Sequence, residues 1–77
     1  MYWKTQYDAQ MTKQVLGDKI KERRKLLKVR QEDLAEISGV ALRTVVAIER
    51  GEGNPSFDTL LKLAHVLGME LQLNVRQ

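Results

Sequence analysis

The sequence contains no cysteine, a single histidine and a single proline among its 77 residues. Without cysteine, disulfides cannot stabilise a small core and zinc sites built on thiolates are excluded. The lone imidazole of His65 also excludes zinc sites that need several histidines. We therefore expect no metal and no cofactor, and we expect His65 to be an ordinary packed or half-exposed side chain.

Long hydrophobic runs are also missing. The longest uninterrupted apolar run extends from Val45 to Ile48, far short of the roughly 20 residues that span a membrane. The first residues, MYWKTQYD, lack the apolar stretch of a secretory signal. These features predict a cytoplasmic protein without a membrane partner.

The chain is too short for most catalytic domains. At 8.9 kDa it has room for one small core, and its hydrophobic content of 43% is typical of a folded chain rather than a disordered one. No general base, nucleophile or metal cluster is visible in it. We expect a binding protein rather than an enzyme.

Positive charge is concentrated in one stretch. Residues 19–30 hold seven basic side chains and one acid, so they carry +6 of charge although the whole chain carries only +3. A concentrated basic surface suits a phosphate-rich partner. For an isolated basic helix a solvated face is the favoured explanation, so the charge alone does not decide the function.

Apolar spacing and end signals predict four helices, at 12–28, 31–38, 42–50 and 56–67. Thr12 is a candidate N-cap of the first helix, and glycines at 39, 51 and 68 follow the ends of the others, where a left-handed residue is favoured. The side chains that share the expected buried faces are Leu16, Ile20, Leu27, Leu34, Ala35, Ile37, Phe57, Leu60, Leu61, Ala64 and Leu67.

After Gly68 the apolar period changes from helical to alternating. Alternation predicts a β-strand, and a lone strand must pair with something because its backbone groups need hydrogen bonds. No other segment alternates convincingly, so we expect pairing with the same strand of a second copy. The residues expected to dimerise in this way are Met69, Leu71, Leu73 and Val75.

The expected fold class is thus all-α, a compact four-helix domain followed by a short C-terminal strand. Its predicted organisation is an N-terminal arm (1–12), a helical domain (13–68) and a dimerisation strand (69–77). The arm carries Tyr2, Trp3 and Tyr7 without a clear period, and its role stays open.

The stretch QEDLAEISGVALRTVVAIERG, residues 31–51, has the pattern of a helix-turn-helix. Ala35 is small enough for two steeply crossed helices to touch, and Gly39 supplies the positive φ of the turn. Val40, Val45 and Ile48 are expected to face the core. The side chains left pointing outward are Leu42, Arg43, Val46, Ala47 and Arg50.

With these motifs, residues 16–69 resemble the lambda-repressor/Cro-like, or Xre-type, helix-turn-helix regulators. The resemblance also includes the Ile48-Glu49-Arg50-Gly51 and Asn54-Pro55-Ser56 turn elements. It implies an all-α bundle that binds duplex DNA as a two-fold dimer.

The resemblance assigns roles to individual positions. Gln31 matches the glutamine that bonds a backbone phosphate. The positions that match those entering the major groove are Leu42, Arg43, Val46 and Ala47. Arg43 alone among them can read a guanine through O6 and N7, whereas Leu42 and Val46 suit thymine methyl groups or simple packing. The full set expected at DNA is Arg30, Gln31, Ala41, Leu42, Arg43, Thr44, Val46, Ala47, Arg50, Asn54 and Ser56.

Two further features follow from the resemblance. Arg24 and Glu49 match positions that form a buried, structural ion pair in the family. Many relatives have Ser or Thr where this chain has Ala41, so a helix cap of roughly 1 kcal/mol is expected to be absent.

These features predict a sequence-specific DNA-binding regulator, a repressor that binds a palindromic operator as a homodimer. A C-terminal strand after the fourth helix is similar to HipB-type antitoxins. The alternative is therefore an antitoxin that neutralises a protein toxin and regulates its own operon, with the N-terminal aromatic residues as candidate contacts to the toxin.

Overall fold

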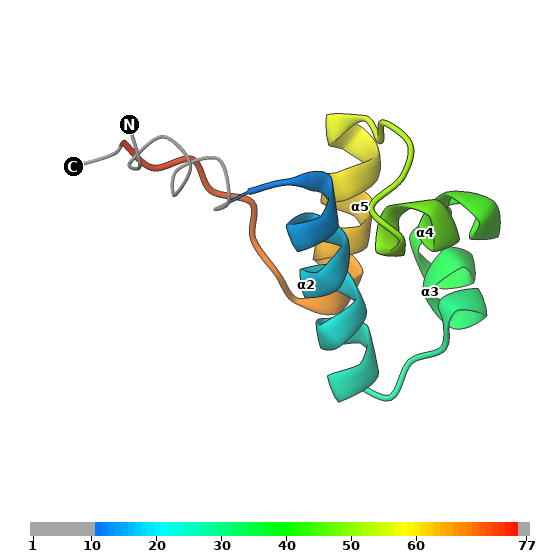
Figure 1. Cartoon of the computed structure of the whole chain (residues 1–77). Helices are drawn as coiled ribbons and strands as arrows, with labels where there is room; N and C mark the ends of the chain where they lie inside the picture. The colour runs from blue at the N-terminus through cyan, green and yellow to red at the C-terminus, as the bar shows by residue number, and fades with distance from the viewer. Residues whose placement is uncertain (1–10, 76–77) are drawn as a thin grey trace.

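The computed structural model describes residues 11–75, which form a bundle of four helices and a C-terminal tail. The helices are α2 (Lys13–Leu26), α3 (Gln31–Ser38), α4 (Leu42–Glu49) and α5 (Phe57–Leu67). Both α2 and α3 pack against α4 and α5. Figure 1 shows α3 and α4 on one side of the bundle, whereas the tail leaves on the opposite side. The predicted all-α class is confirmed, and the aromatic residues of the predicted arm lie outside the described range.

Side-chain caps and left-handed residues set the helix ends. The Thr12 Oγ1 accepts a hydrogen bond from the Val15 amide at 3.1 Å, and the Ser56 Oγ accepts one from the Thr59 amide at 3.0 Å. Gly39, at φ 78°, ends α3 in the left-handed conformation that the tight turn to α4 requires.

Helix α2 ends at Leu26, two residues earlier than the sequence predicts. Lys28 adopts a φ of 59°, which breaks the helix, and the Val29 amide then bonds back to the Arg24 carbonyl at 3.1 Å. A lysine in the left-handed region is uncommon, so nothing in the sequence marks this position as a helix end.

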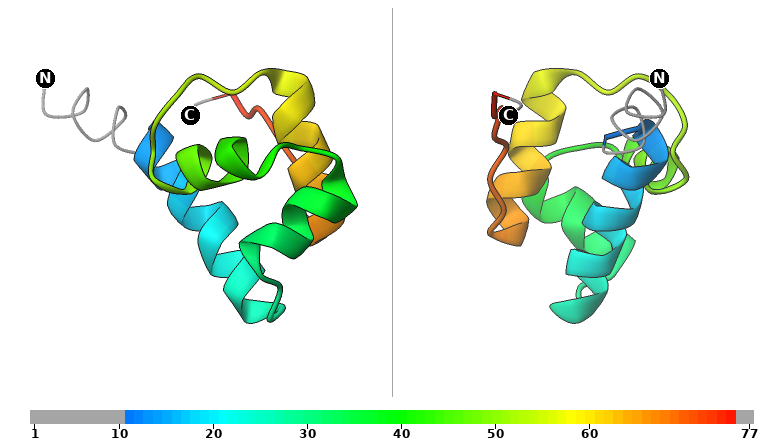
Figure 2. Two further views of the ribbon diagram at one scale, coloured as in Figure 1. Left: turned by 90° about the vertical axis from the view of Figure 1, so that its right-hand side faces the viewer. Right: turned by 60° about the vertical axis from the view of Figure 1, so that its left-hand side comes forward.

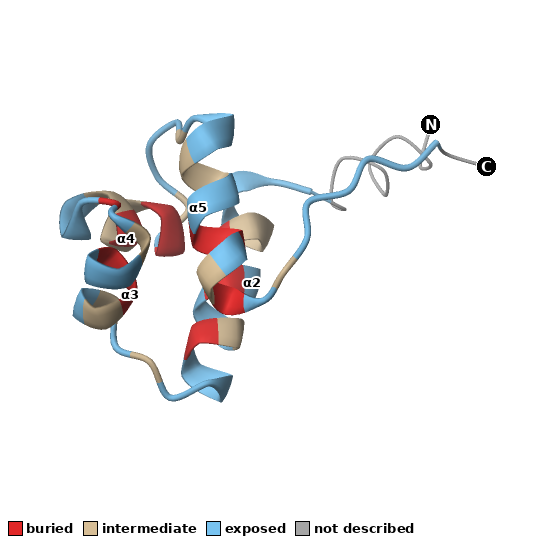
Figure 3. Ribbon diagram, turned by 180° about the vertical axis from the view of Figure 1, so that it is seen from behind, coloured by how far each residue is buried: buried red, intermediate tan, exposed pale blue. Residues whose placement is uncertain are grey.

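The core lies where the four helices face one another, as the buried segments in Figure 3 show. Its fully buried side chains are Leu34, Val45, Leu63 and Leu67. Four predicted core residues are wrong, because Leu27, Ile37, Phe57 and Leu61 are exposed, Ile37 to 66% and Phe57 to 68%.

Leu27 follows the last residue of α2 and so lies beyond its buried side. Helical geometry explains the other three errors. The buried side of α3 contains Leu34 and Ala35, and Ile37 lies roughly 110° around the helix from its centre at 100° per residue.

In α5, the buried Leu63 was missing from the prediction. The buried side of α5 is centred on Leu63, Ala64 and Leu67. Phe57 and Leu61 lie outside that side of the helix and are exposed.

The backbones of α2 and α4 touch at Gly17. This glycine is buried in the middle of α2, and a Cβ built on it would overlap the carbonyl oxygen of Ile48. Only a residue without a side chain permits the two helices to approach so closely. The helical pattern of the sequence did not single out this contact.

The predicted C-terminal strand is absent from the single chain, since residues 69–75 have no regular secondary structure. The reason is that no segment of the described range pairs with them. Figure 2 shows from two further directions how this tail leaves the end of α5. None of the helices in the described range is both long and apolar enough to cross a lipid bilayer.

We predict that Gly17→Ala destabilises the fold. Alanine normally stabilises a helix interior by about 0.5–1 kcal/mol relative to glycine, but here the added methyl group must push α2 away from α4, and overpacking of this kind costs about 1–3 kcal/mol. Chemical denaturation should show a lower free energy of unfolding than the parent. Glu22→Ala, at an exposed position of the same helix, is the control and should change little.

Candidate nucleic-acid interface

Helices α3 and α4, joined by the turn at Gly39, form a helix-turn-helix. Ala35 lies buried on α3, while Val40, Val45 and Ile48 of the turn and α4 are buried in the core. These contacts hold α4 by one side only. Its other side faces outward at the edge of the bundle (Figure 1), as a helix that enters the DNA major groove must.

The outward side of α4 is largely apolar. Leu42 and Arg43 are exposed, and Thr44, Val46 and Ala47 are half-buried. A hollow of about 400 Å³ lies between α4 and the loop that follows it. It brings together four of the predicted DNA-binding residues, and its complete lining is Arg43, Thr44, Ala47, Ile48, Glu52, Gly53, Asn54 and Pro55. Glu52 is a carboxylate on this surface that the sequence did not single out.

Arg24 of α2 and Glu49 of α4 form a buried ion pair. The guanidinium binds the carboxylate through two contacts, Nε to Oε2 at 2.6 Å and Nη2 to Oε1 at 2.9 Å, and the two residues are only 8% and 4% exposed. Arg24 Nη1 also donates to the carbonyl oxygen of Val29 at 2.8 Å. The pair therefore joins α2, the loop before α3 and the end of α4.

Gln31 completes this network. Its Nε2 donates to Oε1 of Glu49 at 3.0 Å, so the first residue of α3 is tied to the last residue of α4. An amide nitrogen has two N–H donors, and this contact uses one of them. The other N–H has no hydrogen-bond partner within residues 11–75 and stays available for an anion at the N-terminus of α3. The sequence pattern did not predict the contact between Gln31 and Glu49.

The network changes the acidity of its members. Burial raises the pKa of Glu49, but hydrogen bonds from Arg24 and Gln31, together with the positive charge of Arg24, outweigh it and hold the pKa below its usual value. The bond to Glu49 raises the pKa of Arg24 in turn. Both groups are therefore ionised at neutral pH.

The remaining predicted DNA-binding residues differ in their exposure and in whether their side chains already have hydrogen-bond partners. Arg30 is exposed and pairs with Asp33 at 3.0 Å, and its hydrogen bond lowers the pKa of that aspartate. Ser56 caps α5, and its hydroxyl also bonds Thr59 Oγ1 at 2.9 Å, so it already has partners within the chain. Arg50 and Asn54 are exposed. Ala41 makes no side-chain cap at the start of α4.

A helix-turn-helix family model matches residues 20–74 of the chain. This range includes α3, α4, α5 and the C-terminal half of α2. The chain therefore belongs to the helix-turn-helix family, of the lambda-repressor-like Xre type. It is a DNA-binding transcriptional regulator and not an enzyme.

Individual relatives agree with this membership. A helix-turn-helix transcriptional regulator of Methanocaldococcus jannaschii is 38% identical over 74% of this chain and 86% of its own length. A regulator of Methanothermobacter thermautotrophicus is 43% identical over 66% of this chain and 74% of its own length. The repressor protein C2 of Salmonella phage P22 is 39% identical over 74% of this chain, which corresponds to 26% of that repressor.

We predict that Glu49→Ala lowers the free energy of unfolding by about 3–5 kcal/mol, because it leaves the Arg24 guanidinium buried without its counter-charge. Replacing both partners with apolar residues, as in Arg24→Met/Glu49→Leu, should recover most of that loss. Urea denaturation of the three proteins measures both effects. Equal stability of the single and double variants would contradict a role for the unpaired charge.

The same pair predicts a pH dependence. Because the pKa of Glu49 is lowered in the folded state, its stabilising effect is present above the ordinary carboxylate pKa and is lost as pH falls through the folded-state pKa. The parent should therefore lose stability on acidification more steeply than Arg24→Met/Glu49→Leu. The exposed Arg30–Asp33 pair is present in both proteins, so its contribution cancels in the comparison of denaturation curves at each pH.

Proposed function

We propose that the protein is a repressor that binds a palindromic operator as a homodimer, with α4 in the major groove of each half-site. The observation that carries this proposal is the outward side of α4, where Arg43 is exposed among apolar neighbours. The amide of Gln31, bonded to Glu49 at the other end of α4, adds a donor for phosphate. Similarity to the phage repressor supports repression as the outcome. A duplex-DNA ligand also supports action in the cytoplasm of a bacterial or archaeal cell.

Phosphate contacts position the protein on DNA in this proposal. The second N–H of Gln31 donates to a phosphate at the N-terminus of α3, where the helix dipole also favours an anion. Arg50 at the C-terminal end of α4 and Asn54 in the loop that follows are exposed and contact the phosphate chain from there. Arg30 joins them once the DNA competes with Asp33 for its guanidinium. Such contacts carry no base information.

Base reading depends on few groups. Arg43 binds guanine O6 and N7, while Leu42 and Val46 contact thymine methyl groups and Ala47 permits close approach of the helix. Thr44 and Ala41 lie near the start of α4 and approach the phosphate chain. Selection of bound sequences from a random duplex pool tests the proposal directly, and it should return a two-fold symmetric site with a guanine in each half.

The two-fold symmetry of the proposed operator requires a two-fold dimer. We place the dimer contact in the C-terminal tail, at Met69, Leu71, Leu73 and Val75. The last three of these side chains are exposed in the single chain. Leaving them in water is unfavourable, and association of two tails removes them from it.

Affinity for the operator should fall steeply as salt rises, because each neutralised phosphate releases counterions. Arg50→Ala should reduce the slope of log affinity against log salt by about 1. Gln31→Ala removes no charge and should leave the slope unchanged while weakening operator and random DNA alike. Fluorescence anisotropy at several salt concentrations measures the slope for the unaltered protein and for each of the two variants. Affinity that is independent of salt would argue against duplex DNA as the ligand.

Arg43→Ala should cost about 1–3 kcal/mol on the operator, the value of a two-bond contact with guanine, and less on random DNA. Preference should relax at one symmetric pair of positions. Arg50→Ala is the matched control, since it removes an exposed arginine at the other end of α4 and should weaken both DNAs together. A parallel loss on both DNAs for Arg43→Ala would make Arg43 another phosphate contact.

A further inference from the structure

The backbone turn that ends α4 places an acidic side chain on the outward side of that helix. The Gly51 amide bonds to the Ile48 carbonyl oxygen at 2.9 Å, and the Glu52 amide bonds to the Ala47 carbonyl oxygen at 2.9 Å. With Gly51 at φ 77°, these two bonds form a Schellman motif, a common glycine-ended turn after an α-helix. In this motif the residue after the glycine contacts the last turn of the helix. Glu52 therefore lies beside Ala47.

Glu52 shares a hollow with the arginine that is proposed to read bases. The hollow of about 400 Å³ between α4 and the following loop is lined by Arg43, Ala47 and Glu52 among others. Arg43 and Ala47 are four residues apart, so they are neighbours on the same side of the helix. Both Arg43 and Glu52 are exposed. Because the side chain of Ala47 is only a methyl group, it leaves the space between the two charged side chains open.

An acidic residue at position 52 does not stabilise the fold. The residue at this place in a Schellman motif often contacts the helix through an apolar side chain. The C-terminal end of a helix also carries partial negative charge, which repels a carboxylate. None of the three ion pairs within residues 11–75 includes Glu52 to offset that repulsion. Departures of this kind from local rules are expected at functional sites.

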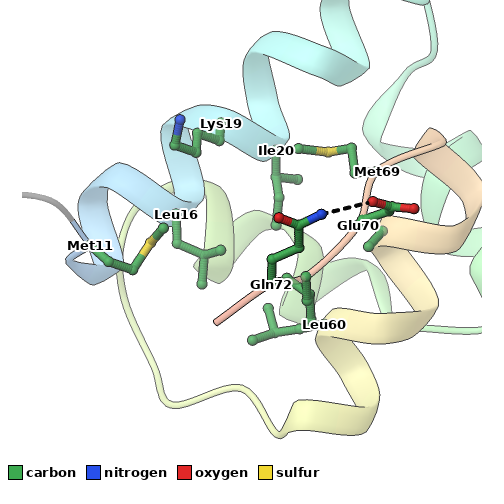
Figure 4. Close-up of a pocket in the computed structure, with 10 residues that line it drawn as sticks. Met11, Leu16, Lys19, Ile20, Leu60, Met69, Glu70 and Gln72 are labelled. Carbon is green, nitrogen blue, oxygen red and sulfur yellow. Dashed lines mark hydrogen bonds between the residues drawn. The ribbon is translucent and has the colours of Figure 1, made fainter. Parts of the chain in front are cut away.

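A carboxylate near the tail shows the contrast. Glu70 lines a hollow of about 350 Å³ between α2, α5 and the tail. Its Oε1 accepts a hydrogen bond from Gln72 Nε2 at 3.1 Å (Figure 4). Within residues 11–75 the carboxylate of Glu52 accepts no hydrogen bond. Both of its oxygens are therefore available to a ligand that approaches α4.

We propose that Glu52 determines specificity by accepting a hydrogen bond from cytosine in the major groove, near the guanine that Arg43 reads. This inference rests on the proposed function and adds a second base-reading residue to it. Bases present two kinds of donor in the major groove, the N4 amino group of cytosine and the N6 amino group of adenine. Adenine also presents the acceptor N7 beside N6, which repels a carboxylate, so Glu52 favours cytosine.

Helix geometry sets where this cytosine lies. Four residues of α-helix rise about 6 Å, and successive base pairs are about 3.4 Å apart. Ala47 therefore lies about two base pairs from Arg43 along the groove. Its methyl group is too short to fill the groove there, and Glu52 is the neighbouring side chain that can. The cytosine is expected about two base pairs from the guanine in each half-site.

The same carboxylate acts against other sequences. Where no amino group faces Glu52, it is held unpaired against base acceptors, and a desolvated charge without a partner is costly. It also lies in the loop that carries Asn54, a proposed phosphate contact, so it repels phosphates nearby. Glu52 therefore penalises random DNA more than the operator, and a repulsive element of this kind raises specificity.

Glu52→Gln tests the base assignment. Glutamine binds adenine through N6 and N7, so selection from a random duplex pool should return adenine where the unaltered protein selects cytosine. The guanine read by Arg43 should stay. With the original operator, the ratio of operator affinity to random affinity should fall at least about fivefold, the low end of the value of a base contact. Urea denaturation should show the variant to be no less stable than the parent, since it removes a negative charge at a helix C-terminus.

Glu22→Gln is the matched control. It removes one exposed carboxylate from α2, beside Arg23 and Met69 near the start of the tail, so it changes the net charge equally at a place away from α4. It should leave both the selected sequence and the affinity ratio unchanged. If Glu52→Gln tightens operator and random DNA by the same factor and changes no base, Glu52 only repels phosphate and the inference is wrong.

Selection with the unaltered protein keeps this outcome separate from the proposed function. A symmetric site that has no cytosine near the guanine, or that stays the same for Glu52→Gln, overturns the role of Glu52 and leaves the repressor function standing. Failure of the unaltered protein to select any symmetric site overturns the proposed function and this inference with it.

Discussion

The contact between Arg24, Glu49 and Gln31 is the interaction on which the DNA-facing surface depends. Two buried charges are costly to remove from water unless each is fully hydrogen-bonded. Here the carboxylate accepts three bonds, two from Arg24 and one from Gln31. The spacing that satisfies those bonds also sets where the N-terminus of α3 lies relative to α4. The amide that we propose binds phosphate and the helix that we propose faces the bases are thus held in one geometry by the same carboxylate.

That ion pair works together with small residues at two positions. Gly17 lets the backbone of α2 meet the end of α4, which brings the guanidinium of Arg24 within reach of Glu49. Ala35 is a small residue buried in the core on α3, and α3 packs against α4. Close approach and charge pairing support each other, because tight packing around the ion pair keeps water from separating the charges.

The helix-turn-helix could be predicted from the sequence because its signals are local. Gly39 ends α3 at a positive φ, and the core positions Val45 and Ile48 recur at helical spacing within a few residues. What the sequence did not reveal depends on distant neighbours. Position 17 must be glycine because the carbonyl oxygen of Ile48 lies against it. Ile37 is exposed because α4 and α5 pack against the other side of α3. The tail is the extreme case, because its alternation predicts a strand whose partner is not in the chain.

In the proposed dimer, α4 and the C-terminal tail have different roles. Helix α4 faces one side of the bundle and the tail leaves from the other (Figure 1), joined through α5 and the bond from Arg23 to Leu67. With α5 packed against both α2 and α3, a dimer formed through the tails carries each α4 as part of a rigid body. In the proposed dimer, the distance between half-sites, about one turn of DNA or a multiple of it, depends on the tail. Base preference within each half-site depends on α4 in the same proposal, so spacing and sequence preference can change independently.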